Sequence, residues 1–260
     1  MAELTSNQKW LFDKVKSTSK KRVQLTVCHA KLNPEQRKQL WLAKRKLKQS
    51  RVVINVDLHR QFRHEQIIDN LLRVKRILNI IEHGDFPGGI HDLNFRGRLL
   101  IEFKLYGATQ DLQIVFGHMH DSERPKYASL DYRNIPQSIT PLGLYGHHRL
   151  VLKDEVKTRA TFTPFDSTMI EIDQVFIWEN IEGVLTTKLN GKFWYEYVLN
   201  NKEPFSVKEG THYIEAQILG LVQLSDIEKI YYPVSDQNDH KFFQKFQRFK
   251  LDHGIQLVHY

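Results

Sequence analysis

The chain has 260 residues, 41% of them hydrophobic, which is enough to bury the core of one large domain or two small ones. No run of about 18 apolar residues occurs and the start is polar, so we exclude a membrane span and expect a protein made in the cytoplasm without a secretory signal. The one cysteine, Cys28, excludes an internal disulfide and, lacking neighbours at zinc-finger spacing, a structural zinc site of the usual kind.

The net charge of +8 is concentrated in the first 50 residues. This segment holds thirteen Lys or Arg against three acidic residues, a local charge of +10, whereas the remaining 210 residues carry −2. Such a segment can bind nucleic acid, an acidic membrane surface or an acidic partner. A solvated helical face is the commoner origin of such charge, so a nucleic-acid partner is an alternative and not the favoured interpretation.

Two helices are predicted at the start of the chain. In "LTSNQKWLFDKVKS" a Thr or Ser cap precedes apolar residues at helical spacing, and in "NPEQRKQLWLAKRKLKQ" Asn33 is the cap and Pro34 the first helical residue. A strand over 51–60 and a helix over 64–84, ended by Gly84, follow.

From residue 85 onward Gly and Pro interrupt the pattern, and short strands are predicted. They are LLIEFKLYG (99–107), LQIVFGHMH (112–120), HHRLVLK (147–153), RATFTPF (159–165), QVFIWEN (174–180), FWYEYVL (193–199) and YIEAQILG (213–220). A last helix, "DHKFFQKFQRFKLDHG", aligns three Phe on one stripe that we expect to dock on the core. The sequence therefore predicts an α+β fold, with helices over 1–50 packed on a domain over 51–260 that contains a large antiparallel sheet.

None of the familiar phosphate-binding or nucleophile motifs is present, neither a Walker loop nor G-x-G-x-x-G nor G-x-S-x-G. His118 and His120, as alternate residues of a strand, would share a face and could hold a metal together with Asp121, but "HDSERP" is more typical of a loop. We therefore predict no metal site.

Polar residues inside the apolar strands are the remaining candidates. Glu215 and Gln217 fall on one face of the strand 213–220, and His59 and Arg60 end the strand 51–60. The strands thus offer a single carboxylate late in the chain and a basic residue early in it. This combination favours a substrate that already carries a good leaving group, such as NAD. Its nicotinamide leaves as a neutral molecule, so the enzyme needs to stabilise a sugar cation and hold the diphosphate.

Structural alternatives exist for these residues. Glu215 could be a salt-bridged strand residue, although Glu is depleted in strands, so catalysis is preferred. The pair His59 and Arg60 could equally cap the strand in solvent. Arg124 could pair with its neighbour in a loop, and the Asp-Ser pair ending at Ser167 is common turn chemistry.

Five segments, in order, resemble an uncharacterised bacterial family over residues 4–231. They are LTSNQKWLFDKV at the start, RLLIEFKLYGA (98–108), ERPKYASL (123–130), RATFTPFDS (159–167) and YIEAQILG (213–220). The layout of that family is similar in turn to mono-ADP-ribosyltransferases. The resemblance implies a split, antiparallel β-sandwich of the ADP-ribosyltransferase type over 51–260.

The same resemblance implies a bacterial effector or toxin, translocated into another cell, that transfers ADP-ribose from NAD to a side chain of a host or competitor protein or hydrolyses NAD. Glu215 would be catalytic, with Gln217 orienting it or the acceptor. NAD-binding roles are implied for His59, Arg60, Tyr127, Thr163, Ser167 and Arg124.

One departure leaves a second interpretation open. Arginine-directed transferases have Gln or Glu two places before the catalytic Glu, whereas here Gln217 follows Glu215. If the register is shifted by two, Gln217 occupies the catalytic place. The chain would then be an inactive binding module that uses its basic N-terminal helices on nucleic acid or an acidic partner.

Overall fold

The N-terminal helices α1 (Ser6–Ala30) and α2 (Pro34–Leu47) form as the sequence predicts. The computed structural model describes residues 3–62, 65–78, 82, 91–106, 117–136, 145–167, 174–206 and 210–260. The Thr5 hydroxyl accepts a hydrogen bond from the Gln8 nitrogen, and the Gln8 side chain accepts one from the Thr5 nitrogen. Asn33 caps α2 in the same reciprocal way, which satisfies backbone donors that a helix start otherwise leaves free.

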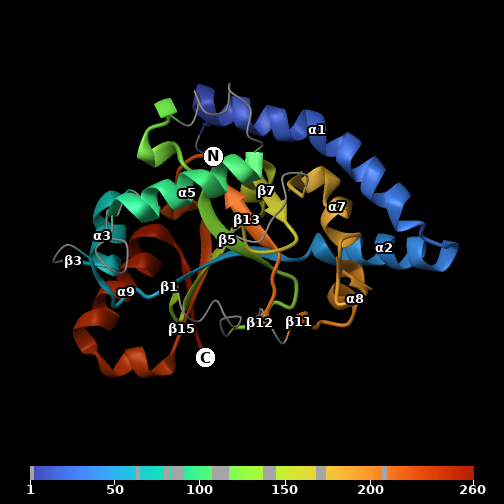
Figure 1. Ribbon diagram of the computed structural model, residues 1–260. Coiled ribbons are helices and arrows are strands. Elements are labelled where there is room, and N and C mark those ends of the chain that lie inside the picture. The colour runs from blue at the N-terminus through green and yellow to red at the C-terminus, as the bar shows by residue number, and fades with distance from the viewer. Residues whose placement is uncertain are drawn as a thin grey trace.

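An eight-stranded sheet forms the centre of the fold (Figure 1). Its order is β16-β15-β6-β1-β5-β13-β7-β8, and every neighbouring pair is antiparallel except β15 and β16, which are parallel. Its strands are β1 (Arg51–Val56), β5 (Lys126–Asp131), β6 (His148–Leu152), β7 (Ala160–Thr163), β8 (Phe176–Ile177), β13 (Glu215–Ile218), β15 (Ile227–Tyr232) and β16 (Gln256–His259). The fold is thus mixed α+β with N-terminal helices and a large mixed sheet.

The other helices and strands of the described part lie outside the main sheet. The further helices are α3 (Ile67–Val74), α5 (His91–Tyr106), α7 (Glu182–Leu185), α8 (Trp194–Leu199) and α9 (His240–His253). The short strands pair two by two as β2 (Gln61–Phe62) with β3 (Glu65–Gln66), β4 (Arg76–Ile77) with β14 (Val222–Gln223), β9 (Lys188–Leu189) with β10 (Lys192–Phe193), and β11 (Phe205–Ser206) with β12 (Gly210–Thr211).

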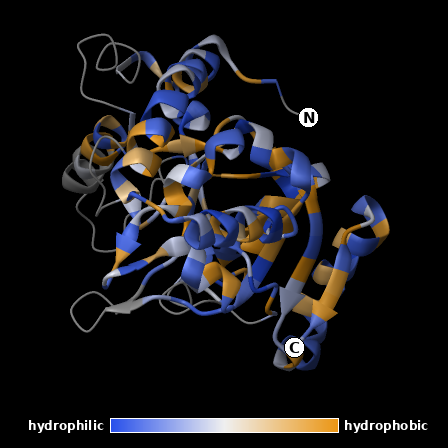
Figure 2. Ribbon diagram, turned by 90° about the vertical axis from the view of Figure 1, so that its right-hand side faces the viewer, coloured by the Kyte–Doolittle hydropathy of each residue, from blue (hydrophilic) through white to orange (hydrophobic). Residues whose placement is uncertain are grey.

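One face of the sheet is apolar and carries the main core. Residues paired across neighbouring strands point to the same side of a sheet, and Ile54, Leu150 and Ile230 form one such row. These side chains belong to one buried cluster with residues of α2, α3, α8 and α9. Figure 2 shows hydrophobic and hydrophilic residues alternating along strands and striping the helices, as this two-sided arrangement requires.

The last helix, α9, docks on this core as predicted. Asp239 caps its start, where the carboxylate accepts a hydrogen bond from the Phe242 nitrogen at 3.1 Å. The helix ends at Gly254, which adopts the left-handed conformation (φ 66°) that favours glycine. Phe242, Phe246 and Phe249 are at most 2% exposed and belong to the main core cluster, so the aromatic stripe faces the sheet.

Two predicted strands are helices instead. The strand predicted over 99–107 is wrong, because residues up to Tyr106 belong to α5, where Glu102, Leu105 and Tyr106 are buried at helical spacing. The segment 193–199 contains α8, which buries Trp194 and Val198 on one side. In both, aromatic and aliphatic content suggested a strand, whereas packing on one side selects a helix.

Other predicted boundaries also change. The helix expected over 64–84 is interrupted after α3, because Lys75 adopts a left-handed conformation (φ 56°) and β4 then pairs with β14. Beyond β4, residue 82 is helical, and residues 79–81 and 83–84 lie outside the described part. The strand expected over 174–180 is only β8, followed by a 3₁₀ turn. Of the strand expected over 112–120, residues 112–116 lie outside the described part, and residues 117–118 are helical.

The N-terminal helices pack on the body of the protein. α2 lies against α7 and α8, where the Lys46 ammonium donates to the Val198 carbonyl at 2.6 Å. α1 lies against α7 and β8, where Arg22 donates to the Val175 carbonyl at 3.3 Å. No helix in the described ranges is long and apolar enough to cross a membrane.

Candidate active site

The second face of the sheet is polar, and most of its polar side chains are buried. Glu215 on β13 lies opposite Ser129 on β5 and Thr163 on β7, so these residues share this face. Its polar members are Arg51, Asn55, Tyr127, Ser129, Asp131, Arg149, Thr161, Thr163, Glu215, Gln217, Lys229 and Tyr231. We call this set the polar face.

Glu215 and Gln217 are the centre of a hydrogen-bond network on the polar face. The Gln217 Nε2 donates to Glu215 Oε1 at 2.8 Å and to Thr163 Oγ1 at 3.1 Å. Thr161 Oγ1 donates to Gln217 Oε1 at 2.9 Å. Because Oε1 of Gln217 faces Thr161, its amide nitrogen is directed at Glu215.

The second carboxylate oxygen of Glu215 is held by the backbone of Ser167. The Ser167 nitrogen donates to Glu215 Oε2 at 3.2 Å, and both residues are at most 4% exposed. Within the described residues, the buried Ser167 Oγ makes no hydrogen bond. A buried hydroxyl with unused hydrogen-bonding capacity beside a fixed carboxylate is a place where a bound molecule can be recognised.

Tyr213, two residues before Glu215, lies at the edge of this network. Its hydroxyl donates to Asp166 Oδ2 at 2.8 Å. Burial, together with the negative charges of Glu215 and Asp166, raises the pKa of the Tyr213 hydroxyl. Tyr213 is therefore a hydrogen-bond donor at neutral pH, close enough to Glu215 for their charges to interact.

Helices α5 and α1 cover part of the polar face (Figure 1). Tyr106 at the end of α5 places its hydroxyl 3.3 Å from Thr161 Oγ1. Leu11 of α1 and Leu105 of α5 belong to a second, smaller buried cluster, against which Tyr127 packs. Tyr127, opposite Gln217 on β5, therefore lies beside the network and lines its covered side.

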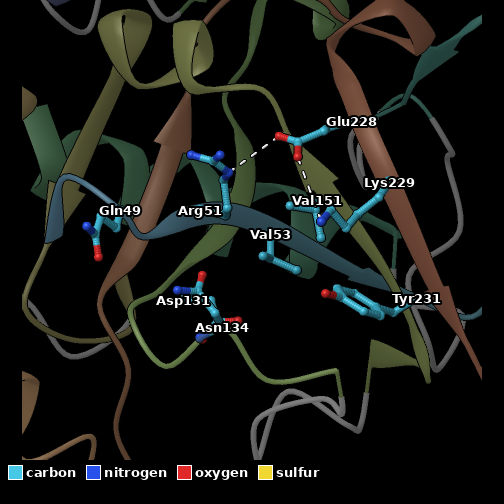
Figure 3. A pocket seen from close by; sticks show the side chains of 9 residues that line it. All are labelled: Gln49, Arg51, Val53, Asp131, Asn134, Val151, Glu228, Lys229 and Tyr231. Atoms are coloured by element: carbon cyan, nitrogen blue, oxygen red, sulfur yellow. Dashed lines mark hydrogen bonds and ion pairs between the residues drawn. The ribbon is translucent and has the colours of Figure 1, made fainter. Parts of the chain in front are cut away.

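A hollow of about 230 Å³ lies on the uncovered part of the polar face, over β1, β6 and β15 (Figure 3). Val53 is at its floor, and Ser129 lies between Val53 and Glu215 in the pairing register. Figure 3 shows Arg51 and Lys229 directed at Glu228, at 3.4 and 3.8 Å. The hollow and the Glu215 network are neighbouring parts of one sheet face.

Asp131 and Arg149 form a buried ion pair at the hollow, which the sequence analysis missed. Arg149 Nη2 donates to Asp131 Oδ2 at 2.5 Å, and the side chains are 1% and 4% exposed. The backbone nitrogens of Arg133 and Asn134 donate to Asp131 Oδ1. Arg149 lies on a predicted strand and Asp131 directly after the ERPKYASL segment, but only the pairing of β6 and β5 with β1 brings them together.

His59 lies away from this network, in a cluster with Asp236 and His148. β1 ends at Val56, so His59 follows the strand in a turn and does not end it as predicted. Its Nε2 is 3.1 Å from Asp236 Oδ1, and its ring stacks on Phe242 at 3.6 Å between centroids. Burial opposes ionisation of Asp236, but hydrogen bonds from His148 and His59 hold its pKa below the ordinary value.

In the described part of the chain, these three side chains are close enough together to be considered as a metal site. Their potential ligand atoms lie within 4.8 Å of one another. The hydrogen bonding of His148 does not fit a metal. Its Nδ1 accepts from the Leu58 nitrogen at 3.2 Å, so its Nε2 carries the proton that it donates to Asp236 at 2.7 Å. Metal-bound histidines instead donate from the second ring nitrogen.

Arg60 and Arg124 are also outside the Glu215 network. Arg60 lines a separate cavity of about 210 Å³ at the end of β1, together with Arg76, Asn70 and Tyr145. Arg124 forms a buried ion pair with Glu102 of α5 at 2.7 Å. Of the predicted site residues, the structure thus brings together Glu215, Gln217, Thr163 and Ser167, with Tyr127 beside them.

The residues considered for a metal in "HMHD" do not share a strand. His118 is exposed at a helical turn, and the His120 ring caps the following turn by accepting from the Ser122 nitrogen at 3.2 Å. Asp121 begins that turn and is 3.7 Å from Arg124. The segment is a loop, as its composition suggested.

No family model matches the chain. The chain is 31% identical over 117 residues to the Gene 2 protein of Mycobacterium phage L5, a match that covers 41% of this chain. The chain spans 44% of the length of that relative. It is thus similar, over part of its length, to a phage protein.

Proposed function

We propose that this protein is an NAD-dependent mono-ADP-ribosyltransferase that modifies a protein side chain of a host or competitor. The observation that carries the proposal is the Glu215 carboxylate, which is buried on the polar face and held at both oxygens by Gln217 and Ser167. A carboxylate fixed before the reaction stabilises the ribose cation that forms as nicotinamide leaves, without reorganisation at that moment.

The hollow beside Ser129 is the place we propose for the diphosphate of NAD. Arg51 and Lys229 line it on the same face as Glu215, and phosphate oxygens would replace Glu228, with which both cations now pair. This revises the roles of His59 and Arg60, which the resemblance implied as anchors but which lie in other clusters. The finer fold assignment, a split β-sandwich of the ADP-ribosyltransferase type, belongs to the same proposal.

Incubation of the protein with adenylate-labelled NAD and a cell lysate tests the proposal. We expect label on lysate proteins with the wild type and with Glu155→Gln, which changes an exposed carboxylate. Glu215→Gln should lower the transfer by about 100-fold or more, because a fixed charge near the reacting centre is lost. Absence of transfer by the wild type, or equal transfer by Glu215→Gln, would contradict the proposal.

A further inference from the structure

The outward side of α2 carries a stripe of cations around one exposed tryptophan. Its other members lie three or four residues from the tryptophan or from one another along the chain, so the set lies along one side of the helix. They are Arg37, Lys38, Trp41, Arg45 and Lys48, and all are exposed. We call them the α2 stripe. The opposite side buries Leu40, Ala43 and Leu47 against the body of the protein, so the stripe faces away from it.

The positive charge of the α2 stripe is not neutralised by the fold. No Asp or Glu occurs between residues 36 and 50. Lys44, nearer the body, pairs with Glu182, and Lys46 donates to the Val198 carbonyl. In the described ranges, none of the four stripe cations forms an ion pair with a carboxylate. Four like charges on one face therefore favour a polyanion.

Trp41 gives the stripe a flat apolar surface. It is 58% exposed, whereas Trp194 in the core is fully buried. The Arg45 guanidinium lies 5.7 Å from the centre of the Trp41 ring, a spacing suited to cation–π contact. Tryptophan rings beside arginine are surfaces on which unpaired bases stack.

We propose that the α2 stripe binds single-stranded nucleic acid, with phosphates on Lys38, Arg45 and Lys48 and a base stacked on Trp41. A single strand fits better than a duplex, because only unpaired bases expose a face to Trp41. A membrane surface fits less well, because Trp41 and its exposed neighbour Leu42 are too few for an apolar helical face. This function is independent of the proposed transferase activity.

Fluorescence anisotropy with a labelled oligothymidylate of about 20 nucleotides tests the proposal. Between about 50 and 200 mM salt, the logarithm of the binding constant should fall linearly with the logarithm of the salt concentration. Replacing Lys38, Arg45 and Lys48 with Gln should reduce this slope by about 2, at roughly 0.7 per phosphate contact. Trp41→Ala should weaken binding by about tenfold, and duplex DNA should bind less tightly than the single strand.

A charge-matched variant, Lys192→Gln/Lys241→Gln/Lys250→Gln, removes three exposed lysines elsewhere and should bind as the wild type does. The proposal is overturned if the wild type does not bind, if this control loses as much affinity as the stripe variant, or if Trp41→Ala has no effect. Tighter binding to duplex DNA or to anionic vesicles would overturn it as well. Circular dichroism of each variant checks that the fold is kept.

Discussion

Gln217 donates its side-chain amide to the carboxylate of Glu215, two residues before it on β13, at 2.8 Å. Thr161 fixes the orientation of that amide by donating to its oxygen. The order Glu then Gln, opposite to that of arginine-directed transferases, thus has a physical consequence here. The amide holds the carboxylate from the covered side of the sheet, and no shift of register is needed to give Gln217 a role.

Gln217→Ala should lower the free energy of unfolding by about 1–3 kcal/mol, because Glu215 and Thr161 lose buried hydrogen-bond partners. Urea denaturation followed by circular dichroism measures the change. Gln256→Ala, at an exposed position of the edge strand β16, is the control and should have little effect. Equal stabilities of the two variants would show that the network is not tightly formed.

Arg149→Met should destabilise the protein by about 3–5 kcal/mol, because Asp131 remains buried without its ion-pair partner. Arg248→Met breaks the exposed pair with Asp252 and should cost about 0–1 kcal/mol. Combining Arg149→Met with Asp131→Asn should recover part of the loss. Thermal and urea unfolding of the variants check these values, and a mild effect of Arg149→Met would contradict the buried pairing.

Because of Lys126, the free energy of unfolding should increase as the pH rises through the alkaline range. Burial lowers the pKa of its ammonium to about 8, against an ordinary 10.5. Between these values the folded chain has lost the proton that the unfolded chain still holds, so unfolding is disfavoured progressively as pH rises. From about pH 8 to pH 10.5, the slope of stability against pH should be more positive in the wild type than in Lys126→Met, in which other groups with shifted pKa values, such as Lys157, still titrate.

The cluster of His59, His148 and Asp236 should not take up zinc. Coordination by His148 Nε2 would require loss of the proton it donates to Asp236 while Nδ1 continues to accept from Leu58. We expect the same melting temperature with one equivalent of Zn²⁺ and with chelator. A rise of several degrees with zinc that Asp236→Asn abolishes would show that the cluster is a metal site.

The sequence predicts much of the sheet because strands such as β6 and β7 have a clear local pattern of strand-forming residues. It fails where packing overrides that pattern, as in α5, whose aromatic and aliphatic residues suggest a strand although Glu102 and Leu105 are buried on one helical side. A residue distant in sequence lies directly against the end of β1. Gly146 approaches so closely that a Cβ there would lie 2.1 Å from the Asp57 nitrogen.

The residues of the candidate site could also be predicted only in part from the sequence. Glu215, Gln217 and Thr163 could be found from alternation within their strands, since a polar residue on an apolar strand is visible locally. Arg149 could not, because its partner Asp131 lies on a different strand with β1 between them. His59 and Arg60 were predicted from their position at a strand end, and the pairing of the sheet places that end away from Glu215.

Nicotinamide release from NAD, measured together with NAD binding, tests the central claim most directly. The wild type and Glu215→Gln should bind NAD with similar dissociation constants, because the diphosphate is held elsewhere. Glu215→Gln should nevertheless release nicotinamide about 100-fold more slowly. Release at the wild-type rate by Glu215→Gln, or no binding of NAD to the wild type, would contradict the role of Glu215.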